Sequence, residues 1–566
     1  MNLKEIREKK GLTQSECASI LGISRRTYQN LEKDDVDTFS QKYQRYCQIL
    51  DSFNSNYDRF LTNVAYGKDL THFKKSVEGF KTRFCYQYLL DYIQKDNYGK
   101  VCILFGLRRT GKTTLLFQLL NELNLNETAY IKVNENNTMG DLVKDINILK
   151  DIGIKNFLID EITLLDDFIN TGATLSDIYA MMGLKIILSG TDSLGFSFSS
   201  RDELFDRNIM IHTSYISFKE FYEVLGIKDI DKYIEYGGTF KIENISFDDP
   251  DYQKEEVAFK DDESTRKYID TAICKNIQRT LRNNKFGGEF YHLKELYEKN
   301  ELTNVINRII ENMNHDFLLS VILDTFKSHD LGSARQLLLK NNNPIIQTAL
   351  YDVDEEAIIK RLKEIIEVKE KEELSIEVDQ LAINQLKQYL SMLDLVREID
   401  YCYDDGSSKK HVVFTQPGMR YSLTKALVYS LMQDSYFNSI SQIDKDIITN
   451  KIISDVKGRM LEDIVLLEKS IRKNSSQKVF KYKSITGGEI DMVIYDNSNN
   501  MSDIYEIKHS NQISFDNQTK FLRNDEIINS LKAIYGDINN KYVLYRGKSC
   551  EINDIKYLNV EDYLMF

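Results

Sequence analysis

The sequence of 566 residues has no tryptophan, only three prolines and seven cysteines, and no long apolar run. Because no stretch reaches the roughly 18 apolar residues of a membrane span, a transmembrane helix is not expected. The first seven residues, from Met1 to Arg7, lack the apolar core of a signal peptide. The cysteines are scattered and have no C-x-x-C spacing, which disfavours disulfides and zinc sites. These absences predict a cytoplasmic protein that is not bound to a membrane.

An excess of basic residues is also missing. The chain has 87 Asp and Glu residues against 74 Lys and Arg residues, which gives a formal net charge of −13. Any contact with nucleic acid must therefore come from local basic patches. The hydrophobic share of 42% and the charged share of 28% are ordinary for a globular protein, and the length predicts three to five domains.

The most specific motif follows an apolar segment at 101–105, which predicts a buried parallel strand. Gly106 to Thr113 fits G-x-x-x-x-G-K-[ST], and a leucine-rich helix is predicted after it. Glycines let the backbone approach phosphates, and the N–H groups at the helix start point toward the anion. Lys112 is expected to reach the β- and γ-phosphates and Thr113 to help hold Mg²⁺. The predicted nucleotide-binding residues are Gly106, Arg108, Arg109, Thr110, Gly111, Lys112, Thr113 and Thr114.

Two further apolar strands end in polar residues. The segment 156–160 ends in Asp160 and is followed by Glu161. Asp160 is predicted to hold Mg²⁺, and Glu161 to orient and polarise the attacking water. The segment 184–188 is followed by Ser189 and further polar residues, which would lie near the γ-phosphate. Because strands and helices alternate over 100–225, the sequence predicts a parallel α/β P-loop ATPase core.

The first fifty residues predict a separate all-α module. A capping box from Thr13 to Glu16 begins a second helix, and a third is predicted from Arg25. The pattern resembles the helix-turn-helix of the lambda-repressor/Cro family, whose third helix lies in a DNA major groove. An alternative reading is a helix-turn-helix that docks a protein. The DNA contacts that the resemblance implies are Gln14, Arg25, Arg26, Gln29 and Asn30.

Motifs after the core point to a family. Arg207 precedes a β-segment, and Ser217-Phe-Lys-Glu-Phe221 follows that segment. Together with the P-loop, the Asp-Glu strand and the Ser-Gly strand end, this pattern resembles bacterial and archaeal AAA+-type ATPases with C-terminal winged-helix and nuclease-like regions. The resemblance implies ATP as the nucleotide, and Arg207 as arginine finger or sensor with Arg201 as second choice. Asp206 stands where the family has glycine, and a surface salt bridge is the alternative role for Arg207.

The C-terminal region contains a second set of acidic and basic residues. Glu462 lies in a predicted helix, Asp491 in a strand, and Glu506-Ile-Lys508 in the next strand. This order resembles the PD-(D/E)xK nuclease core, and strand alternation places Glu506 and Lys508 on one face. The resemblance implies that Asp491 and Glu506 hold Mg²⁺, that Lys508 orients water and stabilises charge, and that Glu462 joins the metal shell or positions water. The alternative is a nuclease-like fold that does not cleave.

A basic stretch near this set predicts a surface that follows phosphates. It contains Lys469, Arg472, Lys473, Lys478, Lys481 and Lys483.

The fold class predicted is multi-domain α/β. Its expected parts are a helix-turn-helix domain at 1–50, a helical linker at 51–99, the ATPase core at 100–225, a lid or connector at 226–285, a helical and winged-helix region at 286–400, and an α/β restriction-endonuclease-like domain at 401–566.

The function predicted is a Mg-ATP-dependent protein, acting on double-stranded DNA and forming homo-oligomers, whose ATPase controls a metal-dependent nuclease. Defence against foreign DNA or maintenance of a mobile element would suit it. One alternative is a DNA-binding regulator switched by ATP, and another is a signalling ATPase that senses a protein partner.

Overall fold

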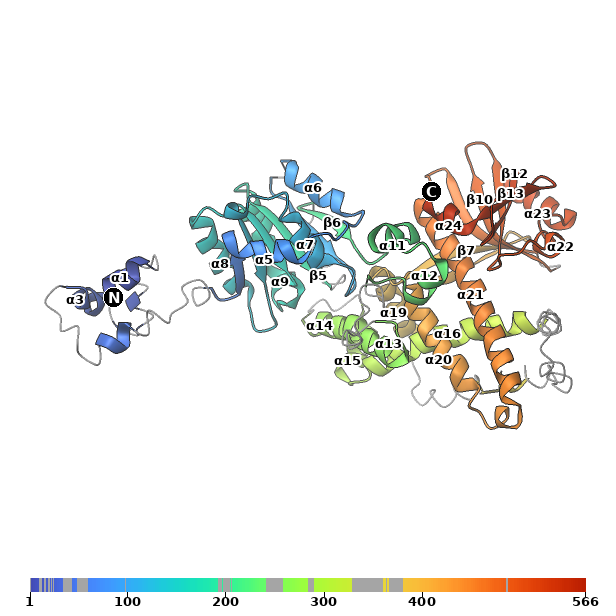
Figure 1. Ribbon diagram of the computed structural model, residues 1–566, viewed down its shortest axis with the longest axis horizontal. Coiled ribbons are helices and arrows are strands. Elements are labelled where there is room, and N and C mark those ends of the chain that lie inside the picture. The colour runs from blue at the N-terminus through green and yellow to red at the C-terminus, as the bar shows by residue number, and fades with distance from the viewer. Residues whose placement is uncertain are drawn as a thin grey trace.

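The structure is a computed structural model, and its helices and strands are numbered as in Figure 1. From residue 60 onward it describes the whole chain except residues 97, 192–195, 197–203, 205, 241–257, 284–289, 328–359, 363, 366–379 and 485–486. Before residue 60 it describes residues 2–9, 13–14, 17–18, 21, 23, 25–33 and 43–47.

The N-terminal module has a small core of its own. Helices α1 (Leu3–Lys9) and α3 (Arg25–Leu31) pack through Leu3, Ile6 and the fully buried Tyr28. The Tyr28 hydroxyl donates to the carbonyl of Leu3 at 3.4 Å. Residues 15, 16, 19 and 20 of the predicted second helix fall outside the described residues.

A six-stranded sheet follows, in the order β1-β3-β4-β5-β2-β6. Neighbouring strands are parallel except β1, which pairs antiparallel with β3. The strands are β1 (Asn63–Tyr66), β2 (Val101–Phe105), β3 (Thr128–Lys132), β4 (Asn156–Asp160), β5 (Lys185–Gly190) and β6 (Asn208–His212).

Both faces of this sheet are covered, which explains why its strands are almost continuously apolar. Along β2, Val101, Ile103 and Phe105 face one core, and Cys102 and Leu104 face the other. The first core is covered by α8 (Met139–Asp151), α9 (Phe168–Thr171) and the π-helical turn Leu175–Ala180. The second is covered by α5 (Leu70–Ser76), α6 (Tyr86–Gln94) and α7 (Lys112–Leu119).

The segment 51–99 is more than the helical linker that the sequence predicts. Strand β1 lies at the edge of the ATPase sheet. Asp145 of α8 fixes the entry to this strand, because its carboxylate accepts hydrogen bonds from the backbone N–H groups of Leu61 and Thr62 at 2.7–3.1 Å. A four-residue edge strand is specified by such tertiary contacts rather than by local periodicity, so the sequence pattern missed it.

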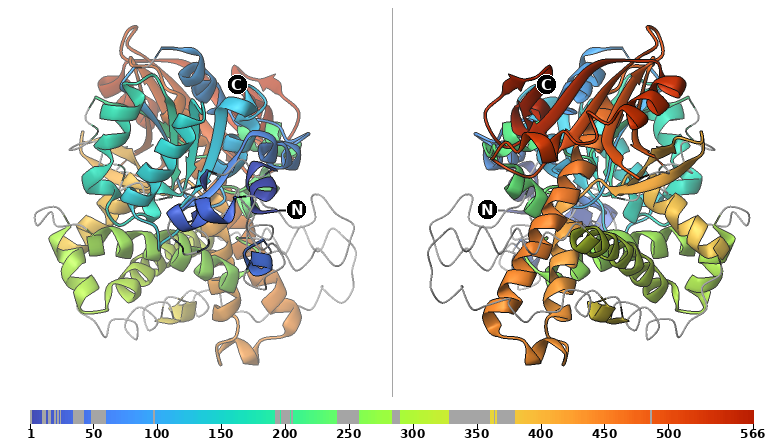
Figure 2. Two further views of the ribbon diagram at one scale, coloured as in Figure 1. Left: turned by 90° about the vertical axis from the view of Figure 1, so that its left-hand side faces the viewer. Right: turned by 90° about the vertical axis from the view of Figure 1, so that its right-hand side faces the viewer.

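Helices connect this core to the C-terminal part. In Figure 1, α11 (Phe218–Leu225) and α12 (Ile230–Tyr236) lie between the two sheets. A helical group with its own core lies beneath them (Figure 2). Its members are α13 (Asp262–Ile269), the π-helical turn Asp270–Cys274, α14 (Lys275–Asn283), α15 (Tyr291–Glu298), α16 (Leu302–Lys327), α19 (Gln380–Met392) and α20 (Pro417–Leu431).

The C-terminal sheet has eight strands in the order β13-β14-β12-β11-β10-β9-β7-β8. Its strands are β7 (Val396–Tyr403), β8 (Ser408–Phe414), β9 (Gln477–Lys483), β10 (Glu489–Asp496), β11 (Met501–Ile507), β12 (Asp537–Tyr545), β13 (Cys550–Ile552) and β14 (Ile555–Asn559). The accompanying helices are α21 (Gln442–Arg472), α22 (Phe515–Gln518), α23 (Asp525–Tyr535) and α24 (Val560–Met565).

The predicted boundary at residue 400 divides a strand of this sheet. Helix α19 and the β7–β8 hairpin occur where a winged helix would have its last helix and wing. The hairpin, however, joins the C-terminal sheet through the parallel pairing of β7 with β9. The structural boundary therefore lies before β7.

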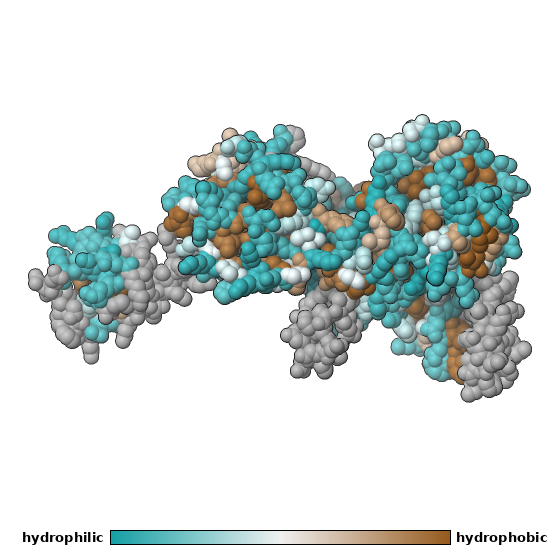
Figure 3. All heavy atoms as spheres, turned by 45° about the horizontal axis from the view of Figure 1, so that its top comes forward, coloured by the Kyte–Doolittle hydropathy of each residue, from teal (hydrophilic) through white to brown (hydrophobic). Residues whose placement is uncertain are grey.

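Helix α21 runs from the helical group to the C-terminal sheet, as Figure 2 shows. Hydrophilic residues dominate the face of the molecule in Figure 3, and hydrophobic residues form scattered patches there. Over the described residues, no helix combines the length and apolarity that a membrane span requires.

Candidate active sites

The P-loop joins β2 to α7 in a conformation that needs its glycines. Gly106 has φ +153° and Gly111 has φ +84°. A Cβ atom at Gly106 would lie 2.4 Å from the Thr213 hydroxyl oxygen, so only glycine fits beside the loop after β6. Arg109 also has a positive φ, +64°, which is uncommon for a residue with a side chain. Backbone strain of this kind is concentrated at binding sites.

Lys112 lies inside the loop. Its ammonium group donates to the carbonyls of Gly106 and Leu107, both at 2.8 Å. Burial lowers the pKa of Lys112 to about 8, against the opposing effect of Glu161 and Asp160. The lysine is thus placed at the centre of the loop, where a phosphate would meet it.

Asp160 accepts hydrogen bonds from hydroxyl groups of three other elements. Its carboxylate accepts from Thr113 of α7 and from Tyr130 of β3, each at 2.9 Å, and from Ser189 of β5. The predicted metal pair Thr113 and Asp160 is therefore brought into contact. Glu161 follows with φ +61° and is partly exposed, so it stands at the same strand end with access to solvent.

Thr114, in α7, is partly buried, and the other three predicted residues of the loop divide into two groups. Arg108 and Arg109 are exposed, and the carbonyl of Arg108 accepts from the Tyr268 hydroxyl of α13 at 3.2 Å. Thr110 is buried, with its hydroxyl 2.8 Å from the Leu107 carbonyl and from the Thr213 hydroxyl. The Thr110 side chain thus stabilises the loop, while the arginine side chains face solvent.

Sequence analysis missed Arg83, which holds the P-loop against the start of α11. Its guanidinium donates hydrogen bonds to the carbonyls of Thr110, Thr213 and Tyr215 at 2.7–3.0 Å. It also forms a bidentate ion pair with the Glu220 carboxylate, with both N–O distances at 2.9 Å. Arg83 is only 6% exposed. Its position before α6, far from the motif in sequence, gave no local signal.

Arg207 lies at the opposite end of the sheet from the P-loop. Its carbonyl accepts from the N–H of Val101, the first residue of β2, whereas the P-loop follows the last. β2 and β6 run parallel, and the Arg207 side chain is half exposed and pairs with Asp177 at 2.5 Å. Within one chain, Arg207 is therefore remote from the phosphate site and forms the surface salt bridge that was its alternative role. Arg201 lies outside the described residues.

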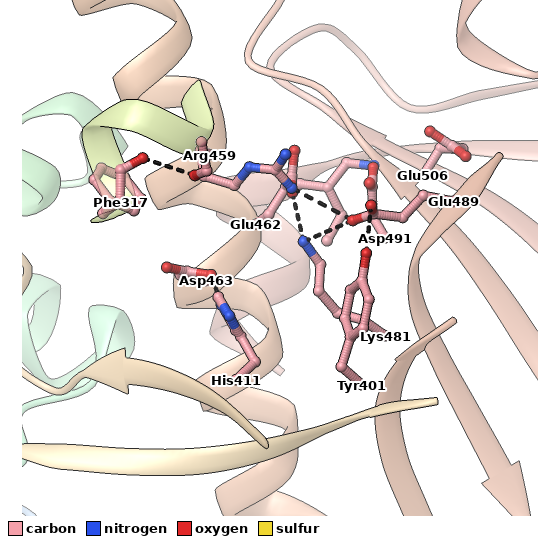
Figure 4. Close-up of polar contacts among 12 residues, drawn as sticks. Phe317, Tyr401, His411, Arg459, Glu462, Asp463, Lys481, Glu489, Asp491 and Glu506 are labelled. Atoms are coloured by element: carbon pink, nitrogen blue, oxygen red, sulfur yellow. Dashed lines mark hydrogen bonds and ion pairs between the residues drawn. The ribbon is translucent and has the colours of Figure 1, made fainter. Parts of the chain in front are cut away.

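The C-terminal set converges at one end of its sheet, and Figure 4 labels three of its members, Glu462, Asp491 and Glu506. Glu462 comes from α21, Asp491 from β10, Glu506 from β11, and Lys508 follows β11. The Lys508 ammonium lies 2.6 Å from Glu506 and 3.1 Å from Asp491, and the N–H of Ile507 donates to Asp491 at 2.7 Å. The structure thus places all four predicted residues in one region.

Four further residues belong to this centre, and sequence analysis assigned none of them to it. Lys481 contacts Glu462 at 2.8 Å and Glu489 at 3.1 Å, and Arg459 contacts the same two carboxylates at 2.8 and 3.4 Å. The Tyr401 hydroxyl donates to Glu489 at 2.7 Å. Strand alternation could have identified Glu489, since it lies two residues before Asp491 and hence on the same face.

Burial and the charges of neighbouring side chains act in opposite directions on the glutamates of this centre. Burial raises the pKa of Glu506 well above the ordinary range and also raises that of Glu462. Burial acts in the same direction on Glu489, but Lys481, Arg459 and Tyr401 outweigh it and lower the pKa of Glu489 to about 2. Lys481 is 1% exposed, so it is an internal cation and not part of the predicted phosphate-following surface.

In the N-terminal module, Arg25, Arg26, Gln29 and Asn30 lie exposed along α3. The Gln14 amide donates to Glu32 at 2.7 Å and accepts from Gln29 at 3.2 Å. The predicted DNA-contacting residues therefore share one face, and two of them are bonded to each other.

Both sites fit the groups that their motifs imply. The close packing at Gly106, the buried Lys112 ammonium and the paired oxygens of Thr113 and Asp160 suit a Mg-nucleotide. In the C-terminal centre, Glu506 Oε1 is buried and has no hydrogen-bond partner among the described residues. Such an oxygen suits a hard divalent cation.

Comparisons with known proteins support two of the domains. A family model described as an AAA domain matches residues 98–222, and one described as a helix-turn-helix matches residues 3–42. The chain is also 22% identical over 460 residues to the uncharacterized protein MJ1544 of Methanocaldococcus jannaschii, covering 80% of this chain and 83% of that protein. The chain therefore contains an AAA-type ATPase domain and a helix-turn-helix domain, and the similarity to MJ1544 extends well beyond the ATPase.

Proposed function

We propose that this is an ATP-driven, DNA-associated protein whose AAA domain controls a metal-dependent nuclease centre in the C-terminal sheet. The observation that carries the proposal is the position of α21 between the two sites. Glu462 of this helix lies in the C-terminal centre, and Glu468, less than two turns later, accepts a hydrogen bond at 2.6 Å from the N–H of Phe218 at the start of α11. One helix thus contacts both the C-terminal centre and α11, the helix that Arg83 links to the P-loop.

At the ATPase site, the roles follow from position. Lys112 would bind the β- and γ-phosphates, and the Thr113 and Asp160 oxygens would hold Mg²⁺. Bound Mg²⁺ would neutralise charge that develops on the phosphates. Glu161, partly exposed beside Asp160, would orient and polarise the attacking water.

At the C-terminal centre, Asp491 and Glu506 would hold a divalent cation through carboxylate oxygens. Such an ion, when bound, polarises the scissile phosphate and lowers the pKa of a bound water. Lys508 keeps both carboxylates in place and would stabilise negative charge on the phosphate as it is attacked. Glu462, held by Lys481, would position water.

Two contact routes support control of one site by the other. The first passes from the P-loop through Arg83 to Glu220 of α11, and from the start of α11 to α21. The second passes through α12, where Asp231 lies 2.8 Å from His509, the residue after Lys508, and also pairs with Arg546 and Lys457. A shift of α11 and α12 during the nucleotide cycle would therefore reach both α21 and the end of β11.

The exposed face of α3 would supply contacts to double-stranded DNA. Because Arg207 lies far from the phosphates of its own chain, it could act on ATP only in a homo-oligomer, across a subunit interface. A cytoplasmic role in defence against foreign DNA, or in maintaining a mobile element, would use these parts together.

Cleavage of linear and circular DNA by the full-length protein with Mg²⁺ or Mn²⁺ tests the proposal. Glu506→Gln should abolish cleavage. Asp503→Asn is the matched control, because Asp503 lies on the same strand, faces the other side of the sheet and should leave cleavage intact. No cleavage on any substrate, with ATP hydrolysis and DNA binding intact, would instead favour an ATP-switched DNA-binding regulator or a signalling ATPase.

A further inference from the structure

We propose that Lys481 and Arg459 take the place of a second metal ion, so that the C-terminal centre binds a single divalent cation, at Asp491 and Glu506. The inference rests on the proposed nuclease function and specifies the metal content of that centre. It concerns two cationic side chains that no motif assigned to the site.

The two cations bridge the same pair of oxygens. Lys481 Nζ lies 2.8 Å from Glu462 Oε2 and 3.1 Å from Glu489 Oε1. Arg459 contacts these same oxygens at 2.8 and 3.4 Å. The other Glu489 oxygen accepts from Tyr401 at 2.7 Å, so Glu462 Oε2 and both oxygens of Glu489 have partners within the chain itself (Figure 4).

This arrangement has the form of a metal site that is filled by side chains. Ligand atoms of Glu462, Glu489 and Asp491 lie within 4.8 Å of one another, which is close enough for one ion. Lys481 occupies the gap between the two glutamates, and its side chain is only 2% exposed. A divalent ion there would have to displace a buried ammonium into surroundings that cannot solvate it, which is strongly unfavourable.

The Asp491 and Glu506 side of the centre is different. Lys508 contacts one oxygen of each carboxylate, Asp491 Oδ2 and Glu506 Oε2. Glu506 Oε1, on a side chain 3% exposed, has no hydrogen-bond partner in the described part of the chain. A buried carboxylate oxygen without a partner is costly, and a cation is the partner that it lacks.

Charge balance gives the same answer. The centre holds four carboxylates, from Glu462, Glu489, Asp491 and Glu506, against three cationic side chains, from Arg459, Lys481 and Lys508. With all groups charged, these four negative and three positive charges give the seven side chains a net charge of −1. One divalent ion would change this net charge to +1, whereas a second would raise it to +3 in buried surroundings, which is strongly unfavourable.

Mn²⁺ binding by the full-length Asp160→Asn protein without nucleotide tests this inference, because that change removes the carboxylate that would hold an ion beside the P-loop. Electron paramagnetic resonance counts bound Mn²⁺ and detects spin coupling between ions about 4 Å apart. We expect one uncoupled Mn²⁺ per chain, lost in Asp491→Asn and kept in Glu489→Gln. In Lys481→Gln the count should rise to two with a coupled signal, whereas Lys481→Arg should keep one.

Two coupled ions before any change at Lys481, loss of the ion in Glu489→Gln, or a single ion in Lys481→Gln would each overturn the inference while leaving a metal-dependent nuclease possible. Absence of any Asp491-dependent ion would overturn the proposed nuclease function as well. The Glu489→Gln measurement decides the matter even if Lys481→Gln does not fold.

Discussion

Arg83 makes five hydrogen bonds, three to backbone carbonyls around the P-loop and two to Glu220. Replacing it with methionine would leave Glu220 buried without its partner. Removing one member of a buried ion pair typically costs about 3–5 kcal/mol. We therefore expect Arg83→Met to lower the unfolding temperature of the ATPase transition in calorimetry and to weaken ATP binding.

The matched control is Arg282→Met. Arg282 also forms an ion pair, with Asp166 at 3.4 Å, but both side chains are more than half exposed. An exposed pair contributes at most about 1 kcal/mol, so this variant should unfold like the unchanged protein. Equal stability of the two variants would contradict the role assigned to Arg83.

Glu161 offers a second test at the level of one side chain. Glu161→Gln should retain ATP binding, because Lys112 and the loop backbone are unchanged, but should lose general-base assistance. A loss of about 10²–10⁴ in ATP turnover is expected, measured as phosphate release under saturating ATP. Glu127→Gln is the control, since Glu127 precedes β3 at the opposite end of the sheet; similar turnover in both variants would argue against Glu161.

The sequence allowed prediction of individual site residues where they belong to short motifs of fixed spacing. Thr113 and Asp160 are in contact, Lys112 lies inside the loop, and the four C-terminal residues converge. Arg83 and Lys481 could not be found in the same way, because each acts on partners distant in the sequence. Only the fold reveals that a lysine in a basic stretch is turned inward.

Among the elements, α3 carries the expected DNA contacts. Arg25→Ala and Arg26→Ala should each weaken binding to duplex DNA. Each should also reduce the slope of log K against log salt concentration by about one, as the loss of a phosphate contact does. Lys4→Ala removes the same charge from the exposed face of α1 and should change little. Fluorescence anisotropy titrations at several salt concentrations measure both quantities, and an equal effect of Lys4→Ala would indicate only general electrostatic attraction.

Strands with continuous apolar runs were predictable, and elements defined by long-range pairing were not. The apolar strands β2, β4 and β5 lie where the sequence indicates, because burial on both faces leaves a continuous apolar run. The edge strand β1 and the attachment of β7 to β9 depend on long-range pairing, which has no local signature. The domain boundaries before residue 100 and near residue 400 shifted for this reason.

In the whole molecule, control of the C-terminal centre by the ATPase requires communication between two distant sites. Asp231 of α12 binds His509, Arg546 and Lys457 of the C-terminal part. Asp231→Asn should weaken this cluster without touching either site. We expect ATP turnover and basal DNA cleavage to be retained, while the response of cleavage to nucleotide becomes smaller.

The control for this variant is Asp151→Asn, a matched change at a carboxylate that is 75% exposed at the end of α8. It should leave the nucleotide response of cleavage unchanged. An identical response in Asp231→Asn would show that α12 does not transmit the state of the ATPase.

The rate of DNA cleavage by the full-length protein with ATP, with ADP and without nucleotide, compared with Lys112→Ala under the same conditions, tests whether the ATPase controls the nuclease centre. We expect the rate to depend on nucleotide in the unchanged protein, and we expect Lys112→Ala to lose this dependence while retaining its C-terminal centre. Cleavage at the same rate in all three conditions, in a protein shown to bind ATP, would contradict control of the nuclease by the ATPase.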